Sequence, residues 1–205
     1  RTAGGTKQPY EPMPGLTTAG GMNHLLNAQS IGVAIGDSAY GAGATAVSID
    51  TLASAANQNT PEGMAYRYAL FKLNYVALIG LNYTTRNQNG ILDHYDPATG
   101  QGTLTDAWVE DRSKLLGWLA QRDRTGSRGD ALQPLLGSTA DSAIFQDVAS
   151  GTEIYVGTSL DLGMTQRISF GDDGANSLGG SSSDDHLYGG QGNDTLDGAA
   201  GNDYL

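Results

Sequence analysis

The clearest pattern in the chain is a leucine that recurs every nine residues at its C-terminal end. Leu178, Leu187, Leu196 and Leu205 keep this spacing without slippage. Glycine opens each nine-residue unit, and Asn or Asp stands two residues before each leucine, so polar and apolar positions repeat in register. One large apolar position in each unit predicts short strands that alternate with glycine-rich turns.

Upstream of the repeats, the pattern predicts a first helix that starts at Thr60. Thr60-Pro61-Glu62 supplies a capping hydroxyl, a proline suited to the first turn and an early acid. Large residues then recur every three or four positions, which predicts an amphipathic helix to about Val76.

A second helix is predicted from near Thr105 to about Arg122. Its apolar residues lie on or near one face and its charged residues lie mostly opposite. The polar segment 86–104 before it contains an asparagine–glycine and an aspartate–proline dipeptide, so it predicts a long loop with two turns.

Short strands are predicted between this helix and the repeats. Segments 143–148 and 152–157 are expected to form a hairpin, and segment 165–170 is a third strand leading into the repeats. Nearer the N-terminus, 22–29 favours a short helix, and 32–43 favours a strand, a turn or a small-residue packing site.

The composition adds a strongly acidic charge. There are 11 Lys and Arg against 22 Asp and Glu, giving a formal net charge of -11. This balance argues against nucleic acid as a partner, and it favours divalent cations or simply keeps the chain soluble. The chain has no cysteine, which excludes disulfides and thiolate zinc sites, and no apolar run long enough to predict a membrane span.

The nine-residue unit has the form G-G-x-G-x-D-x-U-x, where U is a large apolar residue. Glycine permits the positive φ angles and close backbone approaches of a tight turn. Carbonyl oxygens of that turn and the Asp carboxylate are hard ligands of the kind that Ca²⁺ takes in sets of six to eight. The last three residues of each unit are expected to form a short strand with its apolar side chain inward.

These units, GDDGANSLG, GSSSDDHLY, GGQGNDTLD and GAAGNDYL, resemble the calcium-binding repeats of RTX (hemolysin-type) proteins. The resemblance implies a parallel β-roll in which loops two units apart hold the ions between them. Loop 171–176 would then pair with loop 189–194, and loop 180–185 with loop 198–203. Leu178 would stack over Leu196, and Leu187 over Leu205.

The resemblance implies at most two calcium sites. One would use Asn176 and Asp194, the other Asp185 and Asp203, each completed by backbone carbonyls. Because four half-turns bury little surface, we expect weak or incomplete calcium occupancy in this stretch alone. The candidate metal-binding residues are Gly171, Gly174, Asn176, Gly180, Asp185, Gly189, Gly190, Gly192, Asp194, Gly198, Gly201 and Asp203.

Two units depart from the RTX pattern. Asn176 stands where the family has Asp, and an Asn carbonyl is a weaker ligand. Ser181 and Ser183 occupy glycine positions in the second unit, which makes that unit degenerate.

The predicted fold class is α+β, a mixed helical and β-hairpin region followed by the start of a parallel β-roll. We expect a linker or arm at 1–20, an α+β region of uncertain function at 21–170, and a truncated β-roll at 171–205. The chain begins at Arg1 without a leader and ends at Leu205 inside a repeat, so we expect a fragment with more polypeptide on both sides.

Other candidate sites are less specific. The oxygen-rich loop 87–96 is either a separate calcium site or a plain polar loop. His24, His94 and His186 lie in no recognisable triad pattern, and no G-x-S-x-G motif occurs.

Residues 20–170 also resemble the segment that bridges hydrolase core and β-roll in large RTX proteins with a lipase-like α/β-hydrolase domain. The catalytic histidine of that segment would fall at Gln29, a departure from the pattern. Two function hypotheses follow. The chain is a non-catalytic region of a bacterial RTX protein, exported by type I secretion, that folds on Ca²⁺ in the extracellular space. Alternatively, it is the C-terminal part of an RTX lipase or esterase and contributes to a hydrolase active site. A third class, an adhesin or surface-layer segment, would require tandem β-sandwich repeats upstream.

Overall fold

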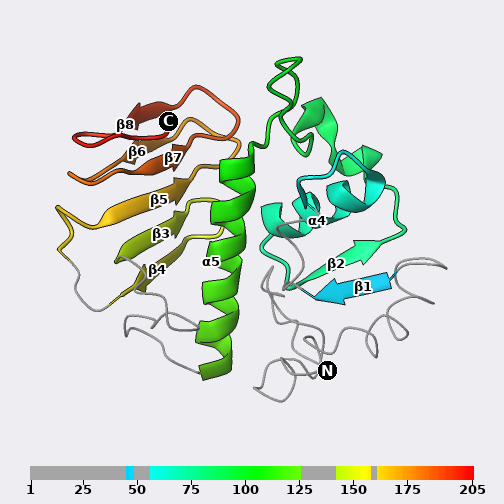
Figure 1. The fold of residues 1–205 in the computed structure, drawn as a ribbon, viewed down its shortest axis with the longest axis horizontal. Coiled ribbons are helices and arrows are strands. Elements are labelled where there is room, and N and C mark those ends of the chain that lie inside the picture. The colour runs from blue at the N-terminus through cyan, green and yellow to red at the C-terminus, as the bar shows by residue number, and fades with distance from the viewer. Residues whose placement is uncertain (1–44, 49–55, 126–141, 158–160) are drawn as a thin grey trace, which may run out of the picture. The chain divides into compact units, whose positions relative to one another are not determined.

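The structure divides into two compact units (Figure 1), Arg1–Gly126 and Ser127–Leu205. It is a computed structural model that describes residues 45–48, 56–125, 142–157 and 161–205. Helices and strands are mixed along the chain, so the fold is α+β as the pattern predicts. The predicted arm (1–20), short helix (22–29) and strand or turn (32–43) lie outside the described residues.

Helix α4, Pro61–Phe71, begins where the sequence predicts. Thr60 Oγ1 accepts a hydrogen bond from Gly63 N at 3.0 Å, and the proline occupies the first turn, where its missing N–H costs nothing. The helix buries Tyr66 and Leu70 in the first unit.

The predicted continuation of this helix to Val76 is wrong. Leu73 takes a left-handed φ of 50°, and Asn74 N donates to Ala69 O at 2.8 Å, which ends the helix at Phe71. The following residues form strand β2, Val76–Ile79, which pairs antiparallel with β1, Thr45–Ser48.

Helix α5, Asp106–Thr125, confirms the second predicted helix and runs slightly past Arg122. Thr105 Oγ1 accepts from Trp108 N at 3.2 Å and caps its start. Both turns predicted in the loop before it are present: the 3-10 turn Gln88–Gly90, and a turn at Asp96, whose carbonyl accepts from Gly100 N at 2.8 Å. A further 3-10 turn, Thr84–Arg86, comes before them. No helix in the described part of the chain is long and apolar enough to cross a membrane.

Arg112 of α5 satisfies the open end of α4. Its Nε donates to Leu70 O at 3.0 Å and its Nη2 donates to Phe71 O at 3.2 Å. Helix α4 has no basic residue in its own last turn. The cation that favours a helix C-terminus therefore comes from the neighbouring helix.

Arg67 joins three separate segments of the first unit. Its Nε donates to Leu92 O at 2.5 Å, and its Nη1 donates to Ala56 O at 2.5 Å and Gln58 O at 2.8 Å. The side chain is fully buried, and burial lowers the pKa of its guanidinium while the charge of Asp93 opposes that shift. A buried cation here replaces water as a hydrogen-bond partner of these carbonyls.

In the second unit, the predicted hairpin and third strand are confirmed. Strands β3 (Ala143–Asp147) and β4 (Thr152–Val156) pair antiparallel around a turn at Gly151, whose φ is 65°. Strand β5, Gln166–Phe170, lies parallel to β3. Strand β5 thus extends the sheet beyond the hairpin and offers the edge that the repeats join.

The repeats supply three short strands: β6 (Ser177–Gly179), β7 (His186–Tyr188) and β8 (Thr195–Asp197). Strand β7 extends the first sheet to the order β4-β3-β5-β7, while β6 and β8 form a parallel pair of their own. The described strands therefore form separate sheets and not one closed or solenoid sheet. Leu178 pairs with Leu196 as predicted.

We predict that Arg67→Met destabilises the first unit by about 2–4 kcal/mol, because three carbonyls lose this donor, two of them in buried contacts. Urea unfolding followed by circular dichroism gives the change directly from the midpoint and slope. The exposed Arg86→Met variant is the control, expected within about 0.5 kcal/mol of the parent. Equal stabilities for the two variants would show that Arg67 does not tie the segments together.

Candidate metal centre

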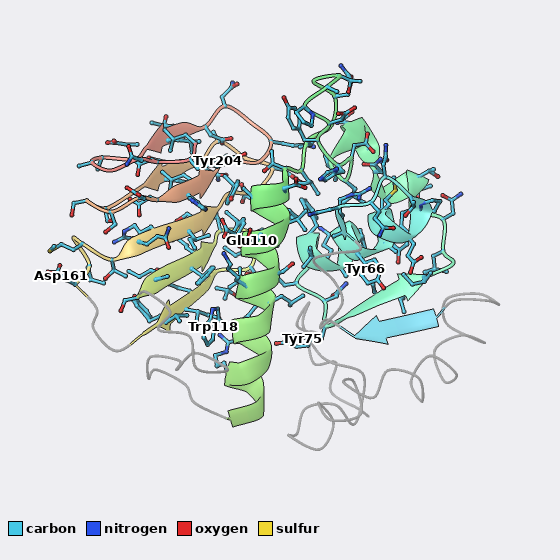
Figure 2. The ribbon with its side chains drawn as sticks, viewed as in Figure 1. Tyr66, Tyr75, Glu110, Trp118, Asp161 and Tyr204 are labelled. Atoms are coloured by element: carbon cyan, nitrogen blue, oxygen red, sulfur yellow. The ribbon has the colours of Figure 1, made fainter. Side chains whose placement is uncertain are left out.

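The candidate centre lies in the four nine-residue units 171–179, 180–188, 189–197 and 198–205. Positions within a unit are numbered from its opening glycine, so that the Asn or Asp is position 6. The strands pair in parallel between units two apart: β6 with β8, and β7 with the last unit through His186 and Tyr204. Figure 2 labels Tyr204 on this last turn.

This strand register brings the predicted loop pairs together. Gln191 N donates to Asp172 O at 3.1 Å and Thr195 N to Asn176 O at 2.8 Å, so loop 189–194 lies against loop 171–176. The other pair repeats these contacts. Ala200 N donates to Ser181 O at 3.3 Å, and Tyr204 N donates to Asp185 O at 2.8 Å.

Backbone carbonyls of one loop face glycines of the next. A Cβ on Gly190 would meet Asp172 O at 2.5 Å, and a Cβ on Gly201 would meet Ser183 O at 2.5 Å. Both glycines have positive φ angles, 90° and 129°. Any side chain at these positions would fill the space in front of the carbonyls, so glycine keeps the oxygens open toward the interval between the loops.

The position-6 carboxylates reach across the same interval. Asp194 Oδ1 accepts from Asn176 N at 2.9 Å, and Asp203 Oδ1 accepts from Asp185 N at 2.9 Å, each over 18 residues of sequence. Both carboxylates are only partly buried. Each pair of loops therefore brings together carboxylate and carbonyl oxygens, the donor set that Ca²⁺ takes.

Asn176 is supported by a carboxylate that sequence reasoning missed. Its Nδ2 donates to Asp172 Oδ1 at 2.9 Å, and its Oδ1 accepts from Asp172 N at 2.8 Å. The hydrogen bond from Asn176, with a second from Gly174 N, lowers the pKa of the Asp172 carboxyl. The sequence contains a signal for this role of Asp172. The first unit has a neutral residue at position 6, and the same unit carries an acid at position 2.

Asp185 has a different environment from the other position-6 acids. It is fully buried, and its carboxylate accepts from Ser181 N at 2.5 Å, Ser181 Oγ at 3.2 Å and Arg167 N at 2.6 Å. Protein donors therefore already solvate this charge.

In the described part of the chain, no three His, Cys, Asp or Glu side chains gather closely enough to hold a metal by side chains alone. A cation between the loops would thus depend on backbone carbonyls for most of its ligands. That dependence suits Ca²⁺, which accepts neutral carbonyl oxygens readily, and does not suit zinc, which favours nitrogen and sulfur.

The alternative oxygen-rich loop satisfies its own polar groups. Asn87 Nδ2 donates to Asp93 Oδ1 at 2.8 Å, and Asp96 Oδ1 accepts from Ala98 N at 2.9 Å. His94 Nε2 lies 2.7 Å from Asp106 Oδ1, which ties the loop to the start of α5. These contacts account for the loop as a polar connection.

Of the residues named for hydrolase chemistry, His24 and Gln29 lie outside the described residues. His186 lies in β7, in ring contact with Tyr188 and Tyr204, with ring centroids 6.4 Å and 5.7 Å away. Its position is that of a strand residue in the repeats.

Comparison with known proteins agrees with this reading of the repeats. Residues 170–205 match the family described as RTX calcium-binding nonapeptide repeat, in four copies. No curated protein and no solved structure matches the chain. The family match covers the repeats. Residues 170–205 are therefore RTX calcium-binding nonapeptide repeats, and the ion that they bind is Ca²⁺.

Proposed function

We propose that the repeats bind Ca²⁺ between paired loops and couple that binding to folding of the array as the first turns of a parallel β-roll. The observation that carries the proposal is the 18-residue register. It sets Asp194 against loop 171–176 and Asp203 against loop 180–185, with carbonyls of the earlier loop facing glycines of the later one. Two ions, one for each loop pair, would complete the arrangement.

The charge of the repeats makes folding depend on the cation. Residues 171–205 contain no Lys or Arg, and their acids are Asp172, Asp173, Asp184, Asp185, Asp194, Asp197 and Asp203. Stacking the loops brings these carboxylates together, which is unfavourable until a cation neutralises them. A ligand that binds only the folded loops shifts the folding equilibrium by its binding free energy.

This coupling suits a protein that leaves the cell before it folds. Ca²⁺ is scarce in the cytosol and plentiful outside, so the array would stay open during export and close after it. The proposal therefore places the chain in a secreted bacterial protein of the RTX type, exported by type I secretion and acting in the extracellular space. The α+β region precedes the repeats in the same chain.

We expect millimolar Ca²⁺ to increase the β-structure signal in circular dichroism of the chain and to raise its stability. At a calcium concentration one hundred times the dissociation constant, the gain is about 2.7 kcal/mol. Mg²⁺ at the same concentration is the control and should do neither, because its smaller octahedral shell fits a carbonyl-lined interval poorly. Identical spectra with and without Ca²⁺, in the chain and in a longer array, would contradict the proposal.

The position-6 acids should matter more than other acids of the repeats. Asp194→Asn is expected to weaken calcium binding about tenfold, or about 1.4 kcal/mol, because it removes charge at the ion. Asp197→Asn makes the same change on an exposed residue at the end of β8 and should alter affinity less than about twofold. Isothermal titration calorimetry compares the two. Equal losses would mean that net charge, and not the position-6 ligand, governs binding.

Asp172 should compensate for the neutral Asn176. We expect Asp172→Asn to weaken the first site about tenfold, and the double variant Asp172→Asn/Asn176→Asp to return to within about threefold of the parent, because one carboxylate is restored. Calcium titration of both variants by calorimetry measures this exchange. A double variant as weak as the single one would show that the Asp172 carboxylate does not serve the ion.

A further inference from the structure

Residues 162–170 lie in phase with the repeats, although they keep only one of the repeat's glycines, Gly163, and lack its acid. Ile168, Ser169 and Phe170 of β5 pair in parallel with the three residues of β7, each with the residue 18 positions later. Strands β6 and β8 pair with the same separation. Counted back from the opening glycine of the first unit, 162–170 is therefore one further unit, and Arg167 occupies its position 6.

The backbone of this further unit makes the contacts of a repeat loop. Ser182 N donates to Gly163 O at 2.9 Å, as Gln191 N donates to Asp172 O. Arg167 N donates to Asp185 Oδ1 at 2.6 Å, the contact that Asn176 N makes with Asp194 Oδ1 one unit later. Loop 162–167 therefore lies against loop 180–185 as the calcium-binding loops lie against one another. The turn begins at Asp161, labelled in Figure 2, whose carbonyl accepts from Met164 N at 2.9 Å.

Serine hydroxyls of the chain itself donate hydrogen bonds between these two loops. Ser182 Oγ donates to Gly163 O at 2.9 Å, and Ser183 Oγ donates to Met164 O. In the later units, Gly192 and Gly201 stand at the position of Ser183, so these loops have no hydroxyl to donate there. Ser182 and Ser183 thus supply hydroxyl hydrogens where a cation would otherwise attract the oxygens.

Protein groups also donate hydrogen bonds to the negative charge of Asp185. Asp185 is buried and accepts three hydrogen bonds, from Ser181 N, Ser181 Oγ and Arg167 N. Arg167 places a permanent cation at the position where the other units carry Asp or Asn, and its Nη2 donates to Leu162 O, the first residue of its own unit, at 3.4 Å. Unit 162–170 therefore carries a permanent positive charge at position 6 without a bound ion.

We infer that 162–167 and 180–185 form a metal-free contact, which holds the first turn of the array in place before Ca²⁺ arrives and serves as the template on which the calcium-dependent loops close. This inference rests on the proposed function for the loops that follow. It also extends the array upstream of the family match, which begins at residue 170.

The test is residue-resolved amide hydrogen exchange by NMR on the whole chain, in EDTA and in millimolar Ca²⁺. Equivalent amides are compared within one molecule. Arg167 N and Ser182 N should keep their protection in EDTA to within about twofold, because their contact needs no ion. Asn176 N and Gln191 N, which make the same hydrogen bonds in a calcium loop pair, should lose about tenfold or more.

A variant tests the donors themselves. Ser182→Ala/Ser183→Ala should lower the protection of the Arg167 and residue-182 amides in EDTA about tenfold, while the number of calcium ions bound, counted by native mass spectrometry, stays that of the parent. Ser177→Ala, at an exposed position of β6, is the matched control and should change neither.

The possible outcomes separate the two claims. Loss of protection at all four amides in EDTA would overturn the metal-free contact and leave calcium-coupled folding intact. Unchanged protection in the double-serine variant would also overturn it, because the hydroxyls would then not hold the loops. No response to Ca²⁺ at any amide, with no ion bound, would remove the proposed function and this inference with it.

Discussion

The second unit depends on one recurring contact, in which a backbone amide donates to a carboxylate 18 residues later. Arg167 N with Asp185, Asn176 N with Asp194 and Asp185 N with Asp203 are three successive examples. Strands of three residues bury too little surface to stand alone. The contact fixes their register, so that apolar position 8 lies over position 8 and the glycine turns lie over one another. Every feature of the candidate centre follows from that superposition.

Much of this arrangement could be predicted because the repeat fixes it locally. The spacing of Leu178 and Leu196 determines which residues stack, and the glycine positions determine where carbonyls can face the next loop. The start of α4 could be predicted as well, because Thr60 and the proline after it act within one turn. Contacts within one turn or one repeat can therefore be predicted from the sequence.

Features that depend on distant partners were not predictable. The apolar residues after Phe71 continue a helical pattern, yet Leu73 turns left-handed and the chain enters β2 to pair with β1. Arg67 looked like an ordinary helix residue, although its donors reach Leu92 and Ala56. Asp172 stands at a glycine position of the repeat, and only the folded loop shows that it bonds Asn176. In each case the deciding partner lies outside the local pattern.

Both units contain carbonyl oxygens that converge from separate segments. Converging carbonyls repel, and burial removes the water that would otherwise solvate them, so they need a cation or a donor between them. Arg67 and Arg112 fill that role in the first unit, each donating to carbonyls of other segments. A guanidinium is part of the chain and is charged at any physiological pH, so these contacts form with the fold and last as long as it does.

The calcium loops leave the same role to an ion that can be absent. Their carbonyls face glycines that carry no side-chain donor, and their acids have no Lys or Arg within the repeats to neutralise them. A contact completed by a free ion is conditional on the concentration of that ion, whereas one completed by an arginine is not. Under the proposed function, segments held by arginine would fold without an added ion, and loops of glycine and acid would fold only where Ca²⁺ is available. Arg167 lies at the boundary between these two kinds of contact. It occupies position 6 of its unit, and the units that follow carry Asn or Asp at that position.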